Sequence, residues 1–104
     1  MRRGEVWWAD LPRPAGRRPV LILSRDRAVQ VREYLTVAEI TRTVRDIPTE
    51  VRLMKTEGLP QDCVANLDVV NTIPKKILVD FIASLDNPKL AAVERALKFA
   101  LALE

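Results

Sequence analysis

The chain has 104 residues and contains no histidine and only one cysteine. The missing histidine removes the most common general base and the most common metal ligand of proteins. A single cysteine forms no disulfide framework and offers no metal-binding spacing. Its neighbours in "DCVANL" favour Cys63 as a small buried residue. The sequence therefore predicts neither a metal site nor a bound cofactor.

Long apolar runs are also missing. No run approaches the ~18 residues that a membrane-spanning helix needs, and the first residues do not resemble a signal peptide. These features predict a cytoplasmic protein without membrane contact. We find no internal repeat, low-complexity segment or linker, so the length predicts one domain over residues 1–104.

Positive charge is concentrated in the first half of the chain. Residues 1–55 contain 12 basic and 7 acidic side chains, whereas residues 56–104 contain 5 and 7. Eleven of the twelve arginines lie in that first half. Arginine binds phosphate in a bidentate manner, and the pI of about 9.4 adds to the case for a nucleic-acid partner. The interleaved acids leave open an ordinary mixed-charge surface.

Short apolar segments separated by turns run through residues 4–85. Alternating or continuous apolar patterns predict strands, and this many short strands with turns between them are typical of a small barrel or sandwich. "RDRAVQVRE" predicts a short helical turn, and "DVVNTIPKK" an irregular segment. The predicted strands are Gly4–Asp10, Pro19–Ser24, Tyr34–Thr41, Thr49–Leu53, Cys63–Leu67 and Ile77–Leu85.

The end of the chain predicts an amphipathic helix. Pro88 suits the first helical position, with Asp86 or Asn87 as the N-cap. An apolar stripe follows at helical spacing, which predicts packing against the barrel or a dimer partner. The stripe comprises Leu90, Val93, Leu97 and Leu101, widened by Ala96, Phe99 and Ala100.

Two arginines stand directly before the apolar strand that starts at Pro19. Arg17 and Arg18 are thereby held at the mouth of a buried strand, where they either solubilise it or hold an anion. Thr41 ends another predicted strand and is followed by Arg42. Thr41 either belongs to a phosphate site at this strand end or is there only because threonine is common in strands.

The order and spacing of six segments resemble the MazF/PemK family of toxin endoribonucleases over nearly the whole chain. The segments are "RRGEVWWADL", "RRPVLILSRD", "VAEITRT", "IPTEVRL", "DCVANLDVVNTIPKKIL" and "VERALKFALAL". The connection "PRPAGR" between the first two strands is shorter than in many relatives and contains no acid.

This resemblance implies a mainly β, α+β fold, a small SH3-like barrel of the CcdB/PemK type with a C-terminal helix. It also implies a homodimer that cleaves single-stranded RNA without metal, leaving 2′,3′-cyclic phosphate and 5′-hydroxyl ends. The implied partner is a cognate antitoxin whose extended acidic and apolar segment blocks the RNA groove.

The catalytic residues that the resemblance implies are Arg18 and Thr41. A guanidinium is a poor base, so Arg18 is expected to stabilise charge on the reacting phosphate. Glu39 shares the face of Thr41 and is a candidate general base or a cross-strand salt-bridge partner. Further candidate phosphate contacts are Arg17, Ser24, Arg25 and Arg42, and Trp7 or Trp8 could stack on a base.

Two alternative functions remain open at this point, because a fold does not determine a function. One is a non-enzymatic poison of the CcdB type that binds a protein such as gyrase, although "FALALE" lacks the terminal Trp-Gly-Ile of such toxins. The other is a small basic RNA-binding barrel without activity.

Overall fold

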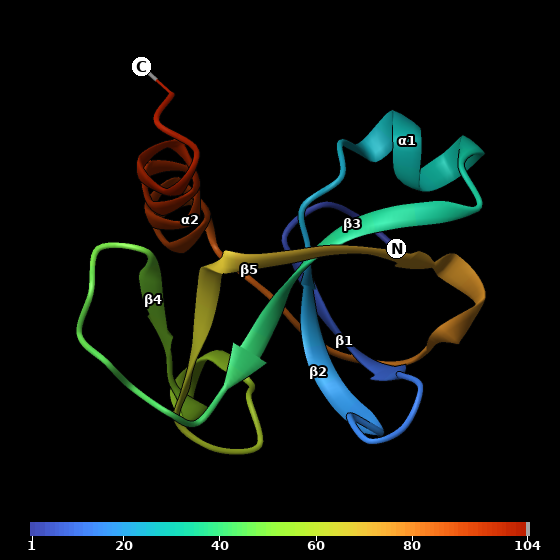
Figure 1. Cartoon of the computed structure of the whole chain (residues 1–104), viewed down its shortest axis with the longest axis horizontal. Coiled ribbons are helices and arrows are strands. Elements are labelled where there is room, and N and C mark those ends of the chain that lie inside the picture. Colours follow the sequence, from blue (N-terminus) through green and yellow to red (C-terminus); the bar gives the residue numbers. More distant parts are fainter. Residues whose placement is uncertain (104) are drawn as a thin grey trace.

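One antiparallel sheet of six strands, ordered β4-β5-β3-β2-β1-β6, forms the body of the protein. The structure is a computed structural model and describes residues 1–103. Figure 1 shows that the sheet curls through half a barrel, with α2 standing over one side and α1 over the other. The predicted fold class, a small mainly β barrel with a C-terminal helix, is confirmed, and the half-barrel stays open between its edge strands β4 and β6.

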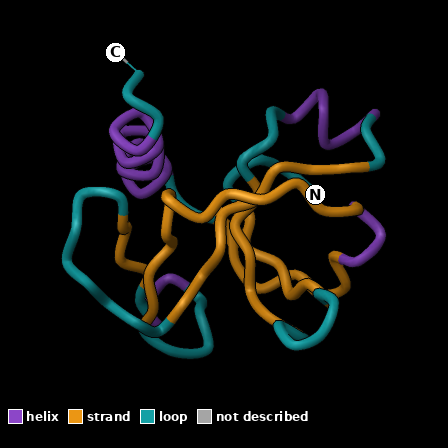
Figure 2. Tube along the Cα trace, viewed as in Figure 1, coloured by secondary structure: helices purple, strands orange, loops and turns teal. Residues whose placement is uncertain are grey.

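The elements follow the sequence pattern closely. The strands are β1 (Glu5–Asp10), β2 (Arg17–Ile22), β3 (Tyr34–Thr41), β4 (Glu50–Leu53), β5 (Cys63–Pro74) and β6 (Leu78–Ser84). The α-helices are α1 (Asp26–Val31) and α2 (Asn87–Ala100). Of two short 3₁₀ helices, η1 (Lys55–Glu57) lies in the loop between β4 and β5, and η2 (Lys75–Ile77) connects β5 to β6 (Figure 2). No helix of residues 1–103 has the length and apolar character needed to cross a membrane.

Both faces of the curled sheet carry a buried core. Alternate residues of one strand contribute to opposite cores, as Val20 and Leu21 of β2 do. The larger core lies under α2, where Val93 is fully buried. The smaller core lies beneath α1, which contributes Val29. A continuous apolar run such as "PVLILS" is therefore needed wherever a strand is covered on both sides.

The strand β5 is longer than predicted, and the interpretation of "DVVNTIPKK" as irregular was wrong. Between Asn66 and Val70, three residues bulge out opposite the adjacent residues Ala38 and Glu39 of β3. The Thr49 hydroxyl holds this bulge by donating to Asp68 Oδ2 at 2.6 Å. The bulge lets one long strand bend across both halves of the sheet.

Two smaller predictions also needed correction. Strand β2 begins at Arg17 rather than Pro19, because the backbone of Arg17 and Arg18 pairs with Asp10 and Ala9 of β1. In the predicted apolar stripe, Val93 and Ala96 of α2 are buried against the sheet, but Phe99 and the C-cap residue Leu101 do not pack there and are 63% and 57% exposed. The helix N-cap is Asp86, whose side chain accepts a hydrogen bond from the Lys89 backbone N–H.

Candidate active site between β2 and β3

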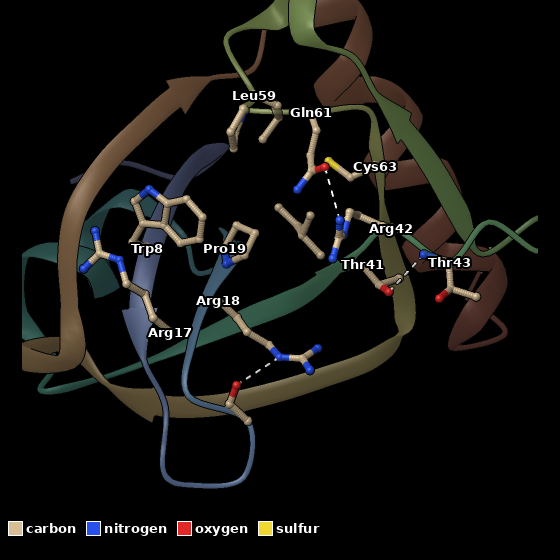
Figure 3. A pocket seen from close by; sticks show the side chains of 13 residues that line it. Trp8, Arg17, Arg18, Pro19, Thr41, Arg42, Thr43, Leu59, Gln61 and Cys63 are labelled. Carbon is tan, nitrogen blue, oxygen red and sulfur yellow. Dashed lines mark hydrogen bonds between the residues drawn. The ribbon is translucent and has the colours of Figure 1, made fainter.

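A cleft of about 560 Å³ opens where β2 and β3 stop pairing. Their ladder ends at the Val20–Glu39 pair, while β2 continues to pair with β1 as far as Arg17. Pro19 has no N–H to donate at this point, which suits a strand that loses its neighbour. The cleft, seen from close by in Figure 3, is lined by Trp8, Ala15, Arg17, Arg18, Pro19, Ile40, Thr41, Arg42, Thr43, Leu59, Pro60, Gln61 and Cys63.

Arg18 projects from the β2 side of the cleft. Its Nε donates to the Ala15 carbonyl oxygen at 3.2 Å, which anchors the base of the guanidinium. Within residues 1–103, neither of its Nη groups has a protein partner. Those two groups form the parallel donor pair that fits two oxygens of a phosphate.

Thr41 and Arg42 lie on the β3 side of the same cleft. If the β2–β3 register is continued by two residues beyond Val20–Glu39, Thr41 falls opposite Arg18. Thr41 Oγ1 accepts a hydrogen bond from the Thr43 backbone N–H at 3.2 Å, so its own hydroxyl hydrogen remains available as a donor. Arg42 Nη1 donates to Gln61 Oε1 across the cleft at 3.4 Å.

Arg17 lines the cleft but has protein partners. Its Nη2 lies 2.7 Å from Asp80 Oδ2, and its guanidinium carbon lies 5.1 Å from the centroid of the Trp8 ring. This arrangement holds the Trp8 indole against the cleft wall by a cation–π contact. Arg17 is therefore placed to orient Trp8, whereas Arg18 is placed to meet a ligand.

The electrostatics of the cleft favour an anion. Three arginines line it, and no carboxylate is among its lining residues within the described part of the chain. Trp8, Pro19 and Leu59 supply an apolar wall beside these charges. Cations next to an aromatic and apolar surface are suited to a nucleotide, which has a charged phosphate and a flat base.

Three sequence candidates lie outside the cleft. Ser24 and Arg25 follow the opposite end of β2, where the Ser24 hydroxyl accepts from the Thr36 backbone N–H at 2.8 Å and Arg25 is the N-cap residue of α1. Glu39 is half-buried in the paired part of β3, next to Val20. The structure thus brings Arg17, Arg18, Thr41 and Arg42 together, but not Ser24, Arg25 or Glu39.

Other lining residues were missed by the sequence analysis. Leu59, Pro60 and Gln61 come from the loop between β4 and β5, which reaches the cleft only because the sheet curls. The sole signal for them in the sequence was a polar stretch, "KTEGLPQD", placed directly before a strand. Trp8 and not Trp7 lines the cleft. Trp7 instead packs edge-to-face against Phe81, with the two ring centroids 5.9 Å apart.

Cys63 borders the cleft but is buried, as its sequence neighbours indicated. Its thiol points to the Leu53 carbonyl oxygen at 3.7 Å. Burial raises the pKa of the Cys63 thiol from its usual 9.0 to about 11, and the carboxylates of Asp62 and Glu57 add to this shift. A protonated thiol is not a nucleophile at neutral pH.

We therefore expect Cys63 to resist alkylation in the folded protein. At pH 8, iodoacetamide should react about 100-fold more slowly than with the chain in urea, because a pKa about two units higher leaves less thiolate. Since the pKa of the thiol is higher in the folded protein, the free energy of unfolding keeps its full value below pH 9. It falls as the pH rises from 9 through about 11, where the buried thiol has to ionise. Mass spectrometry of this single cysteine measures both rates, and equal rates would contradict the buried, protonated state.

Residues 1–103 contain no group of three or more His, Cys, Asp or Glu side chains placed to hold a metal ion.

Comparisons with known proteins agree with the fold described above. The family model of the "PemK-like, MazF-like toxin of type II toxin-antitoxin system" matches residues 2–101. The chain is 36% identical over 100 residues to the probable endoribonuclease MazF5 of Mycobacterium tuberculosis, covering 95% of this chain and 91% of that protein. It is also 42% identical over 91 residues to the probable endoribonuclease MazF2 of the same species, covering 86% and 87%.

Solved structures are similar over nearly their whole length, as two examples show. The Mycobacterium tuberculosis toxin MazF-mt6 has a TM-score of 0.88 at 35% identity, covering 96% of this chain and 98% of that chain. An endoribonuclease in complex with its cognate antitoxin, from a Mycobacterial species, has a TM-score of 0.89 at 29% identity, covering 100% and 97%.

Proposed function

Because this chain belongs to the PemK-like, MazF-like family of toxins, we propose that it is a cytoplasmic endoribonuclease toxin that cleaves single-stranded RNA at short sequence motifs. The observation that carries this proposal is the cleft between β2 and β3. There, Arg18 and Thr41 present hydrogen-bond donors that have no partner within residues 1–103, beside an apolar wall. The relatives named as endoribonucleases support the same conclusion.

The proposed reaction uses a nucleophile that the RNA itself supplies. The 2′-hydroxyl oxygen attacks the neighbouring phosphorus, a new P–O2′ bond forms, and the P–O5′ bond breaks. The products are a 2′,3′-cyclic phosphate and a 5′-hydroxyl. The proton lost from the 2′-hydroxyl goes to water, and the leaving 5′ oxygen takes up one proton from water, so that the step is balanced. Because the nucleophile is already held next to the phosphorus, the reaction requires no metal-activated water.

The protein stabilises the charge that develops on the phosphate. Two Nη groups of Arg18 donate to the non-bridging oxygens, and the Thr41 hydroxyl donates a further hydrogen bond from the opposite side of the cleft. Arg42 adds positive charge at the β3 wall. Glu39 has no part in this mechanism because it lies outside the cleft.

The proposal is tested by incubating the purified protein with mixed-sequence single-stranded RNA in EDTA and mapping the new ends. We expect cleavage at a limited set of motifs, with 5′-hydroxyl ends. Intact RNA would favour the non-enzymatic poison or the RNA-binding barrel. Loss of cleavage in EDTA with recovery in magnesium would overturn the metal-free mechanism.

We further propose that the protein is a homodimer, as the family resemblance implies. Phe99, Leu101 and Leu103 are 63%, 57% and 59% exposed, and such apolar side chains at and just after the end of α2 suit a contact between copies. Sedimentation at micromolar concentration should give about 24 kDa, twice the 11.8 kDa chain. A monomer that still cleaves RNA would refute the dimer.

We also propose that a cognate antitoxin blocks the same cleft. Its segment would place acidic groups near Arg18 and Arg42 and apolar side chains against Trp8, Pro19 and Leu59. Such a segment is expected to be disordered when free and to fold on docking.

The two ligands should differ in their salt dependence. RNA binding releases condensed counterions, so its affinity should fall steeply with salt. The apolar contacts of the antitoxin peptide are not screened, so its affinity should fall less. Salt titrations of both affinities test this, together with a competition assay. Simultaneous binding of RNA and peptide, or a steeper slope for the peptide, would contradict a shared cleft.

A further inference from the structure

Gln61 differs in chemistry from every other side chain of the cleft. The arginines only donate hydrogen bonds, and Trp8, Pro19 and Leu59 present mainly apolar surface. Gln61 alone carries a planar amide, with a carbonyl acceptor and an NH₂ donor at fixed positions. An amide of this kind matches the donor and acceptor pattern of a base edge, and it has no charge to attract a phosphate.

The loop that carries Gln61 is held in place on both sides. Before it, the Leu59 side chain is buried in the larger core, with only 4% exposed. After it, the Asp62 carboxylate accepts from the Lys55 backbone N–H at 3.0 Å. An ion pair also connects the loop to α2, because Lys89 Nζ lies 3.4 Å from Glu57 Oε1. The exposed Gln61 side chain therefore stands on a fixed backbone, as specific recognition requires.

The amide of Gln61 is also oriented. Arg42 Nη1 donates to its Oε1 at 3.4 Å, which assigns the carbonyl end to the arginine. The NH₂ end has no protein partner within residues 1–103. Figure 3 shows Trp8 and Gln61 facing each other across one part of the cleft, with Arg18 and Thr41 around the other part. The phosphate-binding donors and the amide thus occupy different parts of one cleft.

From this arrangement we infer that Gln61 determines base specificity at one nucleotide next to the cleaved phosphate. The base lies against Trp8, and the Gln61 NH₂ group donates to an acceptor on its edge. Arg42 acts as a positioning residue that holds the amide in this orientation. The inference rests on the proposed endoribonuclease function and names a residue that sets its sequence preference.

The test compares the wild type with Gln61→Leu and Gln61→Glu on a randomised single-stranded RNA library in EDTA, with all cleavage ends mapped. Gln61→Leu should lose about tenfold discrimination at one position of the motif and keep the other positions. Gln61→Glu offers only acceptors, so it should shift that position toward bases with an exocyclic amino group. Gln30→Leu is the matched control, because Gln30 lies on α1 outside the cleft.

The outcomes separate the inference from the function on which it rests. No cleavage by the wild type overturns the proposed function, and the inference with it. Cleavage by the wild type with an identical motif in both Gln61 variants overturns the inference alone. Weaker antitoxin-peptide binding by Gln61→Leu with an unchanged motif also overturns it, and assigns the residue to the partner. A merely structural role would lower the rate at every motif equally.

Discussion

Arg18→Lys is expected to slow RNA cleavage by at least about 100-fold, nearly as much as Arg18→Ala. Lysine keeps the positive charge but loses the two parallel Nη donors, and it cannot reproduce the bond from Nε to the Ala15 carbonyl oxygen in the same geometry. Single-turnover rates on one defined RNA measure the effect. Because the Arg18 side chain is exposed, both variants should fold as the wild type does.

The matched control for this prediction is Arg25→Lys. Arg25 was a candidate phosphate contact in the sequence, but it lies at the other end of β2, so this substitution should change the rate by no more than about twofold. Near-normal cleavage by Arg18→Lys would show that the reaction uses only the charge. A large loss in Arg25→Lys would mean that the RNA path extends to α1.

A single 2′-deoxy nucleotide on the 5′ side of the cleaved bond should stop cleavage there, with a loss of at least about 10³-fold. The substitution removes the oxygen that attacks the phosphorus and leaves the charges of the cleft unchanged. Gel analysis of an RNA with one cut site, in EDTA, measures the rate. The same substitution on the 3′ side of the bond is the control and should still allow cleavage.

The outcome distinguishes two kinds of nuclease. Cleavage that persists at the 2′-deoxy position would require an external nucleophile such as water, and Arg18 and Thr41 would then have to act with an activating group that the proposal lacks. Binding of the uncleaved RNA, measured in parallel, should stay near that of the all-ribose strand, because the phosphates proposed to contact Arg18 and Arg42 are unchanged.

Local patterns predicted most of the elements. Strand β3 begins at Tyr34 and ends at Thr41, as the alternation predicted, and α2 begins at the Asp86 cap and Pro88. These signals depend on neighbours within a few residues, so the sequence displays them directly. The second half of β5 could not be predicted in this way. It pairs with Leu35 and Thr36 beyond a bulge at residues 67–69, and this bulge interrupts the alternation of inward and outward side chains along β5.

The candidate site also has a part that the sequence predicted and a part that it did not. The sequence placed Arg18 beside Pro19 at the start of a strand and Thr41 at the end of another, and both line the cleft. Residue type and position alone did not distinguish Arg18 from Arg17, and only the family resemblance singled out Arg18. The structure adds a physical difference, because Asp80 of β6 binds Arg17.

The sequence by itself determined the strand-rich fold class and the C-terminal helix, which follow from residue types and short spacings. The order and spacing of its segments also indicated the family, and that resemblance implied the two residues on which the proposed chemistry rests. Only the tertiary structure decided which residues share the cleft. Ser24 and Arg25 lie close to Arg18 in sequence but at the far end of β2, whereas Gln61 is distant in sequence and reaches the cleft through the curl of the sheet. The physical reason is that a strand separates its two ends by about 3.3 Å per residue, while pairing and curvature bring distant segments together.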